Sequence, residues 1–292
     1  MHALLARIVA ALLLLSGTSG CRELALRESE SPLKPTRMSD DSLVLDVFFI
    51  RCPMGDPRLN EALWAEVDEQ QLPPGLRRRL AENGFRAGLV AGSLPPTLAD
   101  LMELPGKPPP ADESGEVRTV SLEDEPTVVR RHLQTPPGKR NEVVASALYE
   151  SLPALRCCEG QLRGETFHQA QGIFGVRARP QSDGRVRLQL VPELHYGRPR
   201  QRWAGHQGVL RMETRRARQV YDDLAVDVPL LPGDMLVFSS LPSRPGSLGH
   251  YFLTAGRGEL QQKLLVVRLS QTQHDGVIRV PEGGVGGDQV TR

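Results

Sequence analysis

The sequence predicts an α+β fold, in which a small N-terminal α+β module is followed by a mainly antiparallel β-sheet or sandwich-like domain. Three observations lead to this prediction. Strand-like runs and leucines at helical spacing share residues 42–104, a proline-rich and acidic stretch follows, and apolar and polar residues alternate from residue 143 onward. Alternation with a period of two is typical of half-buried strands, and turn residues between such runs indicate hairpins.

Residues 1–20 have the pattern of a signal peptide. His2 and Arg7 form a weakly basic start, the apolar run Ile8 to Leu15 follows, and small residues lead to Cys21. This run is far shorter than the ~20 residues that cross the hydrocarbon core as a helix. A basic flank, a short apolar run and a small-residue exit are together typical of export signals. The alternative is a buried core helix at residues 8–15 of a cytosolic protein.

The segment Thr18-Ser19-Gly20-Cys21 resembles the end of a bacterial lipoprotein signal. It matches that signal at Ser19, Gly20 and Cys21 and departs from it at Thr18, where leucine is usual. The resemblance covers residues 1–21 and implies cleavage before Cys21, attachment of palmitate-type acyl chains to that cysteine, and a lipid anchor on the periplasmic face of a membrane. Because of Thr18, ordinary cleavage and release into the periplasm remain an alternative.

Residues 21–41 are polar and contain two prolines, so we expect a flexible tether. The module at residues 42–104 follows. Its first run, Leu43 to Ile50, is rich in β-branched and aromatic residues and predicts a buried strand. Asp56-Pro57 predicts the start of a helix, with Asp56 as the capping residue and Pro57 in the first turn.

The rest of the module predicts two more helices and one more strand. Leu76 and Leu80 share a helix face, and Asn83-Gly84 predicts its end because glycine tolerates positive φ. Residues 85–91 predict the second strand, and three leucines predict the third helix: Leu94, Leu98 and Leu101.

A linker and a β-rich domain complete the chain. Residues 105–142 begin with PGKPPP and continue through acidic residues, which predicts a linker. In the predicted β-rich domain at residues 143–272, the clearest hairpin joins Phe174–Arg179 to Val186–Leu190 through Asp183-Gly184, a strong turn signal. Residues 235–238 and 264–269 predict further strands. Residues 273–292 are glycine-rich and predict a disordered tail.

Parts of this β-rich region resemble bacterial secretin domains. The run 174–194 is similar to their paired strands, in which an Asp-Gly turn is followed by a strand that ends in Pro-Glu. Further pieces are similar to the secretin signature: residues 228–231, Gly233-Asp234, and Ser247-Leu248-Gly249 before Phe252. The spacing departs from that of the family, and the chain has only one candidate N-terminal module. The resemblance covers about residues 174–269 and implies a ring-forming component.

The sequence offers little for metal binding or disulfides. Besides Cys21 there are three cysteines, Cys52, Cys157 and Cys158. An odd set cannot pair fully within one chain, so the alternatives are free thiols or one bond from Cys52 to the vicinal pair. No two histidines have the i, i+4 spacing of a helical zinc motif. His168 and His195 would bind zinc with the vicinal cysteines only if the fold brought them together. We predict no metal and no cofactor.

No catalytic constellation is recognisable in the sequence. Ser247 lies in a stretch that fails the G-x-S-x-G spacing of a nucleophile elbow, so we expect a turn residue there. The acidic pairs at residues 123–125 and 222–223 can act as acid and base only within a cleft that raises one pKa, and such clusters usually face solvent. We therefore expect a non-catalytic protein, with an envelope hydrolase of unrecognised site as the alternative.

Arginine dominates one stretch of the predicted β-rich domain. Seven arginines fall within residues 198–218, and Glu213 is the only acid among them. Guanidinium groups bind phosphate or carboxylate bidentately, so we single out four as candidates for binding an anionic surface: Arg211, Arg215, Arg216 and Arg218. The alternative is an outward strand face balanced by acids elsewhere.

The charge balance excludes a global attraction to polyanions. Without residues 1–20, basic and acidic residues are equal at 35 each. Such a chain has no overall field for collecting nucleic acid, and export also argues against that partner. We therefore expect a cell-envelope lipoprotein with a binding or assembly role, held at a membrane by its lipid anchor. Its partner would be another envelope protein or a cell-wall polymer, and it would act as an accessory to a larger complex.

Overall fold

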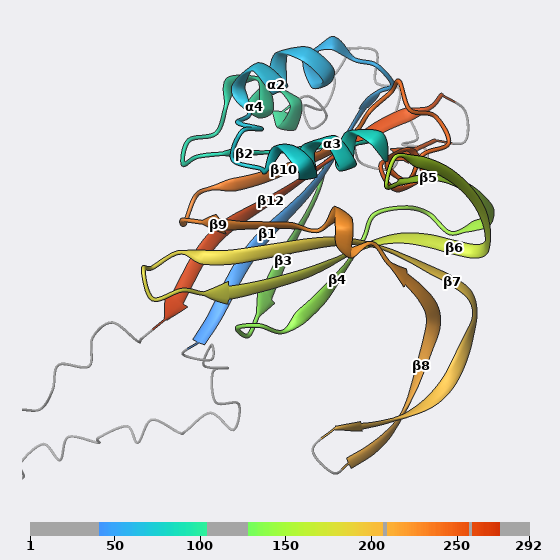
Figure 1. Ribbon diagram of the computed structural model, residues 1–292. Helices are drawn as coiled ribbons and strands as arrows, with labels where there is room; N and C mark the ends of the chain where they lie inside the picture. Colours follow the sequence, from blue (N-terminus) through green and yellow to red (C-terminus); the bar gives the residue numbers. More distant parts are fainter. Residues whose placement is uncertain (1–40, 104–127, 207–208, 257–258, 275–292) are drawn as a thin grey trace, which may run out of the picture. The chain divides into compact units, whose positions relative to one another are not determined.

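The computed structural model describes residues 41–103, 128–206, 209–256 and 259–274. These residues form two β-sheets in which every pair of neighbouring strands is antiparallel, with helices beside one of the sheets (Figure 1). The predicted predominance of antiparallel sheet is thereby confirmed. The predicted signal peptide, Cys21 and the tether lie outside the described residues, as does the predicted glycine-rich tail from residue 275 onward.

The first sheet contains strands from both ends of the described chain. Its order is β2-β10-β12-β1-β3, and the short β11 pairs with β12. The central strands β1 and β12 pair along their whole length, from Asp41 opposite His274 to Pro53 opposite Gln261. The strands span β1 (Asp41–Pro53), β2 (Phe85–Val90), β3 (Val128–Thr135), β10 (Met235–Ser240), β11 (Thr254–Ala255) and β12 (Gln261–His274).

The second sheet is built around two long strands, β6 and β7. Its order is β4-β6-β7-β8, with β5 paired to β6 and β9 paired to β7. The strands span β4 (Arg140–Val144), β5 (Tyr149–Cys158), β6 (Gln161–Pro180), β7 (Val186–His206), β8 (Val209–Val220) and β9 (Val226–Leu230). β6 and β7 exceed the usual strand length of about 3–10 residues, and each pairs with different strands along its length. β6, for example, pairs with β5 over residues 161–170 and with β4 over residues 173–177.

One apolar core lies between the two sheets. Alternate residues of β1, β10 and β12 face alternate residues of β6, β7 and β9 across it, as expected for stacked sheets. Four phenylalanine rings from both sheets and a short helix form its centre, with ring centroids 5.2–6.3 Å apart in edge-to-face arrangements. They are Phe85, Phe174, Phe238 and Phe252. This core therefore joins the two sheets into one packed body.

Helices cover the other face of the first sheet. A second apolar cluster packs Leu59, Leu63 and Leu98 against the outward residues of β1, β10 and β12. The helices there are η1 (Arg58–Ala62), α2 (Leu63–Glu66) and α4 (Pro96–Glu103). Helix α3 (Pro74–Glu82) packs through Leu76 and Leu80 onto the core between the sheets. The short α5 (Leu248–Phe252) lies in that core as well.

Several local predictions are confirmed. Asp56 precedes η1 and accepts a hydrogen bond from the Arg58 backbone N–H at 2.9 Å. Helix α3 ends at Glu82, and Gly84 has a φ of +78°. The Asp183-Gly184 turn joins β6 to β7, with Pro180 opposite Val186. Turn chemistry and apolar spacing thus specify these elements locally.

The boundaries predicted between large parts of the chain need correction. Residues 42–104 and 143–272 were predicted as a module and a separate domain, but β1 pairs with β12, and β2 pairs with β10. The predicted linker at 105–142 also ends too late, because residues 128–135 and 140–144 are β3 and β4. Residues 104–127 lie outside the described residues.

Strand β3 was missed because little of it is buried. It is an edge strand, and most of its side chains are exposed or half-buried. Its attachment to β1 includes a buried carboxylate, Asp46, which forms an ion pair with Arg130 at 3.1 Å and lies 2.5 Å from the His132 Nδ1 atom. An edge strand held by polar pairs lacks the clean alternation by which a sequence pattern identifies strands.

Candidate functional site: the arm formed by β7 and β8

The distal parts of β7 and β8 form a two-stranded arm. We define the arm as residues 196–206 of β7 and 209–217 of β8. The last pair between β6 and β7 is Gln171 with His195, and β9 pairs only with residues 186–190 of β7. Beyond His195, the two strands of the arm pair with each other alone among the described strands. Figure 1 shows them curving away from the sandwich as a ribbon.

A bulge separates the arm from the sheet. Tyr196 pairs with Ala217, and the next pair is Arg200 with Arg215, so residues 197–199 face a single residue of β8. Gly197 adopts a φ of +75° within this bulge. An extra loop of chain in one strand bends a ribbon and increases its twist. The bulge therefore marks the point at which β7 and β8 turn away from the body.

The register of the arm divides its residues between two faces. Three successive pairs on one face are Arg200 with Arg215, Arg202 with Glu213, and Ala204 with Arg211. The intervening pairs belong to the other face, because side chains alternate along a strand: Gln201 with Thr214, Trp203 with Met212, and Gly205 with Leu210. Among the residues whose side chains are described, one face thus carries Arg200 and Arg215, and the other carries Gln201, Met212 and Thr214.

The arm exposes both kinds of residue. Arg198, Arg200 and Arg215 are exposed, and Arg216 is half-buried. On the other face, Met212 is 53% exposed, which is high for a large apolar side chain. Four arginines were predicted as an anionic-surface site. Of these, Arg211 has a side chain that is not among those the structure describes, and Arg218 forms an ion pair with Glu193 at the base of the arm.

A charged cluster connects three strands at the base of the arm. At its centre is Glu193 of β7, which is 3% exposed. Arg140 of β4 donates to its two carboxylate oxygens, at 3.2 Å from Nε and 2.5 Å from the terminal nitrogen. His195 Nε2 lies 3.2 Å from the carboxylate, and the Arg218 guanidinium of β8 lies at 3.7 Å. The cluster therefore ties β4, β7 and β8 together where the arm begins.

The surroundings of Glu193 keep it ionised. Burial raises the pKa of a carboxyl group, but hydrogen bonds from His195 and Arg140 and the positive charges of Arg140 and Arg218 outweigh this effect. Together they lower the pKa of Glu193 to about 2. At neutral pH the cluster is thus a carboxylate held by two guanidinium groups, and this arrangement is costly to break because the partners would stay partly buried.

A glycine makes room for this cluster. Gly175 of β6 lies beneath the pair formed by Arg140 and Glu193. A Cβ at this position would lie 2.4 Å from the Glu193 Oε1 atom and 3.2 Å from the Arg140 Nε atom. Arg140 therefore reaches Glu193 across β6 only because Gly175 has no side chain.

The structure does not bring the other candidate ligands together. His195 belongs to the cluster at the base of the arm, whereas Cys157 lies beside α3, where its backbone N–H donates to Asn83 Oδ1 at 2.9 Å. His168 is opposite Ser151 in the hairpin of β5 and β6. Within the described ranges, no three side chains of His, Cys, Asp or Glu are grouped to hold a metal ion.

The described cysteines are unpaired, and the remaining polar candidates, Ser247 and Asp223, make local structural contacts. Cys52, Cys157 and Cys158 are all free thiols. Burial raises the pKa of the Cys52 thiol to about 11, so it is protonated at neutral pH. Ser247 caps α5 by accepting from the His250 backbone N–H at 3.3 Å. Asp223 pairs with Arg156 at 2.8 Å.

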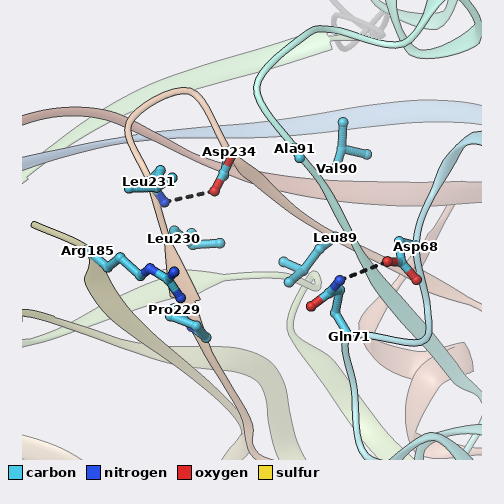
Figure 2. A pocket seen from close by; sticks show the side chains of 10 residues that line it. All are labelled: Asp68, Gln71, Leu89, Val90, Ala91, Arg185, Pro229, Leu230, Leu231 and Asp234. Carbon is cyan, nitrogen blue, oxygen red and sulfur yellow. Dashed lines mark hydrogen bonds between the residues drawn. The ribbon is translucent and has the colours of Figure 1, made fainter. Parts of the chain in front are cut away.

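A small pocket lies between the ends of β2 and β9. Figure 2 shows Leu89, Leu230 and Arg185 among the residues that line it. Its volume of about 220 Å³ is below the range of about 300–1,000 Å³ that is typical for ligand pockets. Its carboxylates close local turns: Asp68 accepts from Gln71 at 2.9 Å, and Asp234 accepts from the Leu231 backbone at 2.8 Å. We therefore regard the arm as the stronger candidate site.

Comparison with protein-family models, with curated proteins and with solved structures gives no match. The segments that resemble secretin domains lie in β6, β7, the end of β9, the turn before β10 and the start of α5. None of the helices in the described part of the chain has the length and hydropathy of a transmembrane span.

Sequence reasoning found the arginines of the arm but missed the cluster at its base. The pairing of Arg140 with Glu193 joins residues 53 positions apart, and no local pattern connects them. One signal was available: Glu193 is an acid within the otherwise apolar run Leu188 to Leu194, interrupted only by Gln189. A charged residue in such a run is rarely buried without a partner, and this would have indicated an ion pair.

Proposed function

We propose that this chain is a non-catalytic binding protein of the cell envelope, anchored by acyl chains on Cys21. Its arm contacts the anionic phospholipid headgroups of the membrane that holds the anchor. The observation that carries this proposal is the amphipathic arm, which projects from the sandwich and presents arginines on one face and Met212 on the other.

The way the arm is built favours a contact role. An isolated two-stranded ribbon is at most marginally stable in water, because neither strand buries a full face. The arm extends beyond the last pair between β6 and β7, and among its described side chains only Tyr196 at its base packs against the core, beside Phe167. A segment that adds little to the core but carries a dense set of arginines is better explained by a binding partner than by the stability of the fold.

The chemistry of the arm fits an anionic membrane surface. Each arginine close to such a surface contributes about 1 kcal/mol of binding free energy. An apolar face that includes Met212 can enter the boundary between headgroups and acyl chains, as amphipathic helices do at membrane interfaces. The predicted anchor at Cys21 would keep the body near that surface, so weak contacts made by the arm become effectively intramolecular.

Vesicle binding tests this proposal. The chain starting at residue 22 lacks the acylation site, so any binding reports on the folded body. We expect it to co-sediment with vesicles that contain phosphatidylglycerol but not with pure phosphatidylcholine vesicles, and we expect binding to weaken as salt is added. Arg198→Gln combined with Arg200→Gln should lower the partition coefficient about thirtyfold, at about 1 kcal/mol for each arginine.

A matched control removes the same charge elsewhere. Arg131 and Arg163 are exposed on β3 and β6, away from the arm. The double variant Arg131→Gln and Arg163→Gln should therefore bind almost as well as the parent chain. Equal losses in the two double variants would mean that net charge, and not the arm, drives binding. Absence of binding to phosphatidylglycerol vesicles would contradict the proposed membrane contact.

A further inference from the structure

A second pocket lies between α3 and the edge strand β2. Its volume is about 400 Å³, within the typical range for pockets that bind small molecules. Residues of the helix and of the strand line it together with Leu241. Leu80, Phe85 and Ala87 are buried behind this lining, whereas Pro74 is exposed and Ala81 and Leu241 are half-buried. Four charged residues also line it: Glu69, Arg77, Arg78 and Arg86. We call this cavity the α3 pocket.

Two of these charged residues already satisfy each other. Arg86 donates to both carboxylate oxygens of Glu69, at 2.9 and 2.8 Å, and to the Asn60 carbonyl oxygen at 3.2 Å. Its guanidinium carbon also lies 4.3 Å from the centre of the Trp64 ring. Arg86 and Glu69 therefore form a fixed, neutral wall of the pocket, and they add no net charge to it.

Arg77 is different, because its guanidinium lacks a comparable partner. Its Nε atom is buried and has no hydrogen-bond partner among the described residues. Asp68 interacts with Arg77 electrostatically, but its carboxylate accepts hydrogen bonds from the Gln70 backbone at 2.8 Å and from Gln71 at 2.9 Å. A buried donor left unpaired costs about 1–3 kcal/mol, so an acceptor that reaches the half-buried Arg77 guanidinium would gain free energy.

The remaining arginine is largely outside the pocket. The side chain of Arg78 is 79% exposed, and it lies 3.9 Å from Glu82 one helical turn away. Arg86 is matched with Glu69 and Arg78 with Glu82, so Arg77 is the one arginine of the lining without an ion pair among the described residues, and Asp68 offsets only part of its charge. A single charge beside apolar walls fits a monoanion with an apolar group better than it fits a phosphate dianion.

From these contacts we infer that the α3 pocket binds a carboxylate that carries a short apolar group, with Arg77 as the carboxylate-binding residue. The apolar group lies against Pro74, Ala81 and Leu241. Two sources have this chemistry, a free aliphatic carboxylate and the C-terminus of a peptide. A peptide would in addition run along β2, an edge strand to which the described chain adds only the bridge between Asp68 and Leu89. The site is separate from the arm, so the inference does not depend on membrane binding.

Calorimetric titration of the chain from residue 22 tests the inference. The probes are hexanoate, hexylamine, inorganic phosphate, and the dipeptide acetyl-Ala-Leu with either a free or an amidated C-terminus. We expect saturable binding of hexanoate or of the free-acid dipeptide, and none of hexylamine or the amide. Tighter binding of the free-acid dipeptide than of hexanoate would identify the peptide source, and the reverse order would identify the free carboxylate.

Three variants locate the binding site. Arg77→Gln removes the proposed carboxylate partner and should weaken binding about tenfold or more. Ala81→Leu adds a side chain at the pocket wall without lowering helix propensity, so it should block binding even if Arg77→Gln affects folding. Arg131→Gln on β3 is the control and should leave the affinity unchanged. The inference is overturned if neither carboxylate binds, if phosphate binds more tightly than both, or if Ala81→Leu binds as the parent does.

Discussion

At the residue scale, the most informative position is Glu193. It is a nearly buried carboxylate on the second sheet, and its neighbours come from three strands. Burying an ion is unfavourable unless partners replace the water, and here Arg140, His195 and Arg218 replace it. The arm therefore begins at a point of the sheet that is held by charge pairs, whereas the core between the sheets is held by apolar packing.

The first prediction concerns the glycine beneath this cluster. Gly175→Ala would place a Cβ 2.4 Å from the Glu193 Oε1 atom, so the ion pair must shift. We expect the free energy of unfolding to fall by about 2 kcal/mol, a typical cost of overpacking. Urea denaturation measures the change. Gly164→Ala in the same strand is the matched control, because its nearest neighbour would be 3.6 Å away, and it should change stability by less than about 1 kcal/mol.

The second prediction concerns pH. The pKa of Glu193 in the folded protein is about 2, below its ordinary value of 4.5. The ionised carboxylate therefore stabilises the fold fully above about pH 4.5, and this contribution disappears as the pH falls through about 2. Glu193→Gln should cost about 3 kcal/mol at neutral pH, because the guanidinium groups lose their counter-ion.

Urea unfolding of both proteins between pH 7 and pH 2 checks this prediction. The difference between the parent chain and Glu193→Gln should shrink toward acid pH, since the parent also loses the charge there. A difference that stays constant to pH 2 would show that the charge of Glu193 is not what stabilises the cluster.

At the element scale, the arm is the part of the fold that we expect to serve binding without contributing to the stability of the body. Its two strands pair with each other but have no third strand beside them among the described residues. Its hydrogen bonds are therefore local, and its removal should leave the body intact. The same reasoning explains why the arm can carry six arginines and an exposed methionine: neither group has to fit a packed core.

The third prediction is that the arm can be removed without unfolding the protein. Because Tyr196 and Ala217 are cross-strand partners, an Asn-Gly turn between them would close the ribbon at its base. We expect the free energy of unfolding to change by no more than about 1 kcal/mol, as for other changes outside the core. Binding to phosphatidylglycerol vesicles should be lost. A truncated chain that no longer unfolds cooperatively would mean that the arm supports the sandwich.

At the scale of the whole molecule, the first sheet joins the two ends of the described chain. β1 lies between β12 and β3, and β2 pairs with β10. Neither residues 42–104 nor residues 143–272 therefore contain the complete first sheet or the complete core. The described residues from position 41 onward should fold as one cooperative unit.

The fourth prediction tests this cooperativity. A fragment of residues 128–274 lacks β1 and β2, so β3 loses its only described partner and the core loses Phe85. We expect no cooperative urea transition and no near-UV circular dichroism from this fragment. The chain from 41 to 274 should show both. Cooperative unfolding of the shorter fragment would contradict this expectation and would support the division into a module at residues 42–104 and a separate domain at residues 143–272.

Short-range patterns predicted individual elements well. The strand at Leu43–Ile50, the helix that ends before Gly84, and the hairpin at Asp183-Gly184 each depend on residues that are close together in the chain. The arginine-rich stretch was likewise visible as composition. By contrast, β3 and the cluster around Glu193 depend on partners far away in the sequence, so no local pattern identifies them.

The sequence by itself determined the antiparallel strands, their turns and the position of the arginines, because turn chemistry and side-chain alternation act between near neighbours. Its prediction of export and of a lipid on Cys21 concerns residues outside the described structure. Only the tertiary structure decided that β1 completes the sheet of β12 and that Arg140 reaches Glu193 across Gly175. Pairings between distant strands depend on which apolar faces and charges match once the chain is packed, and this is a property of the whole fold.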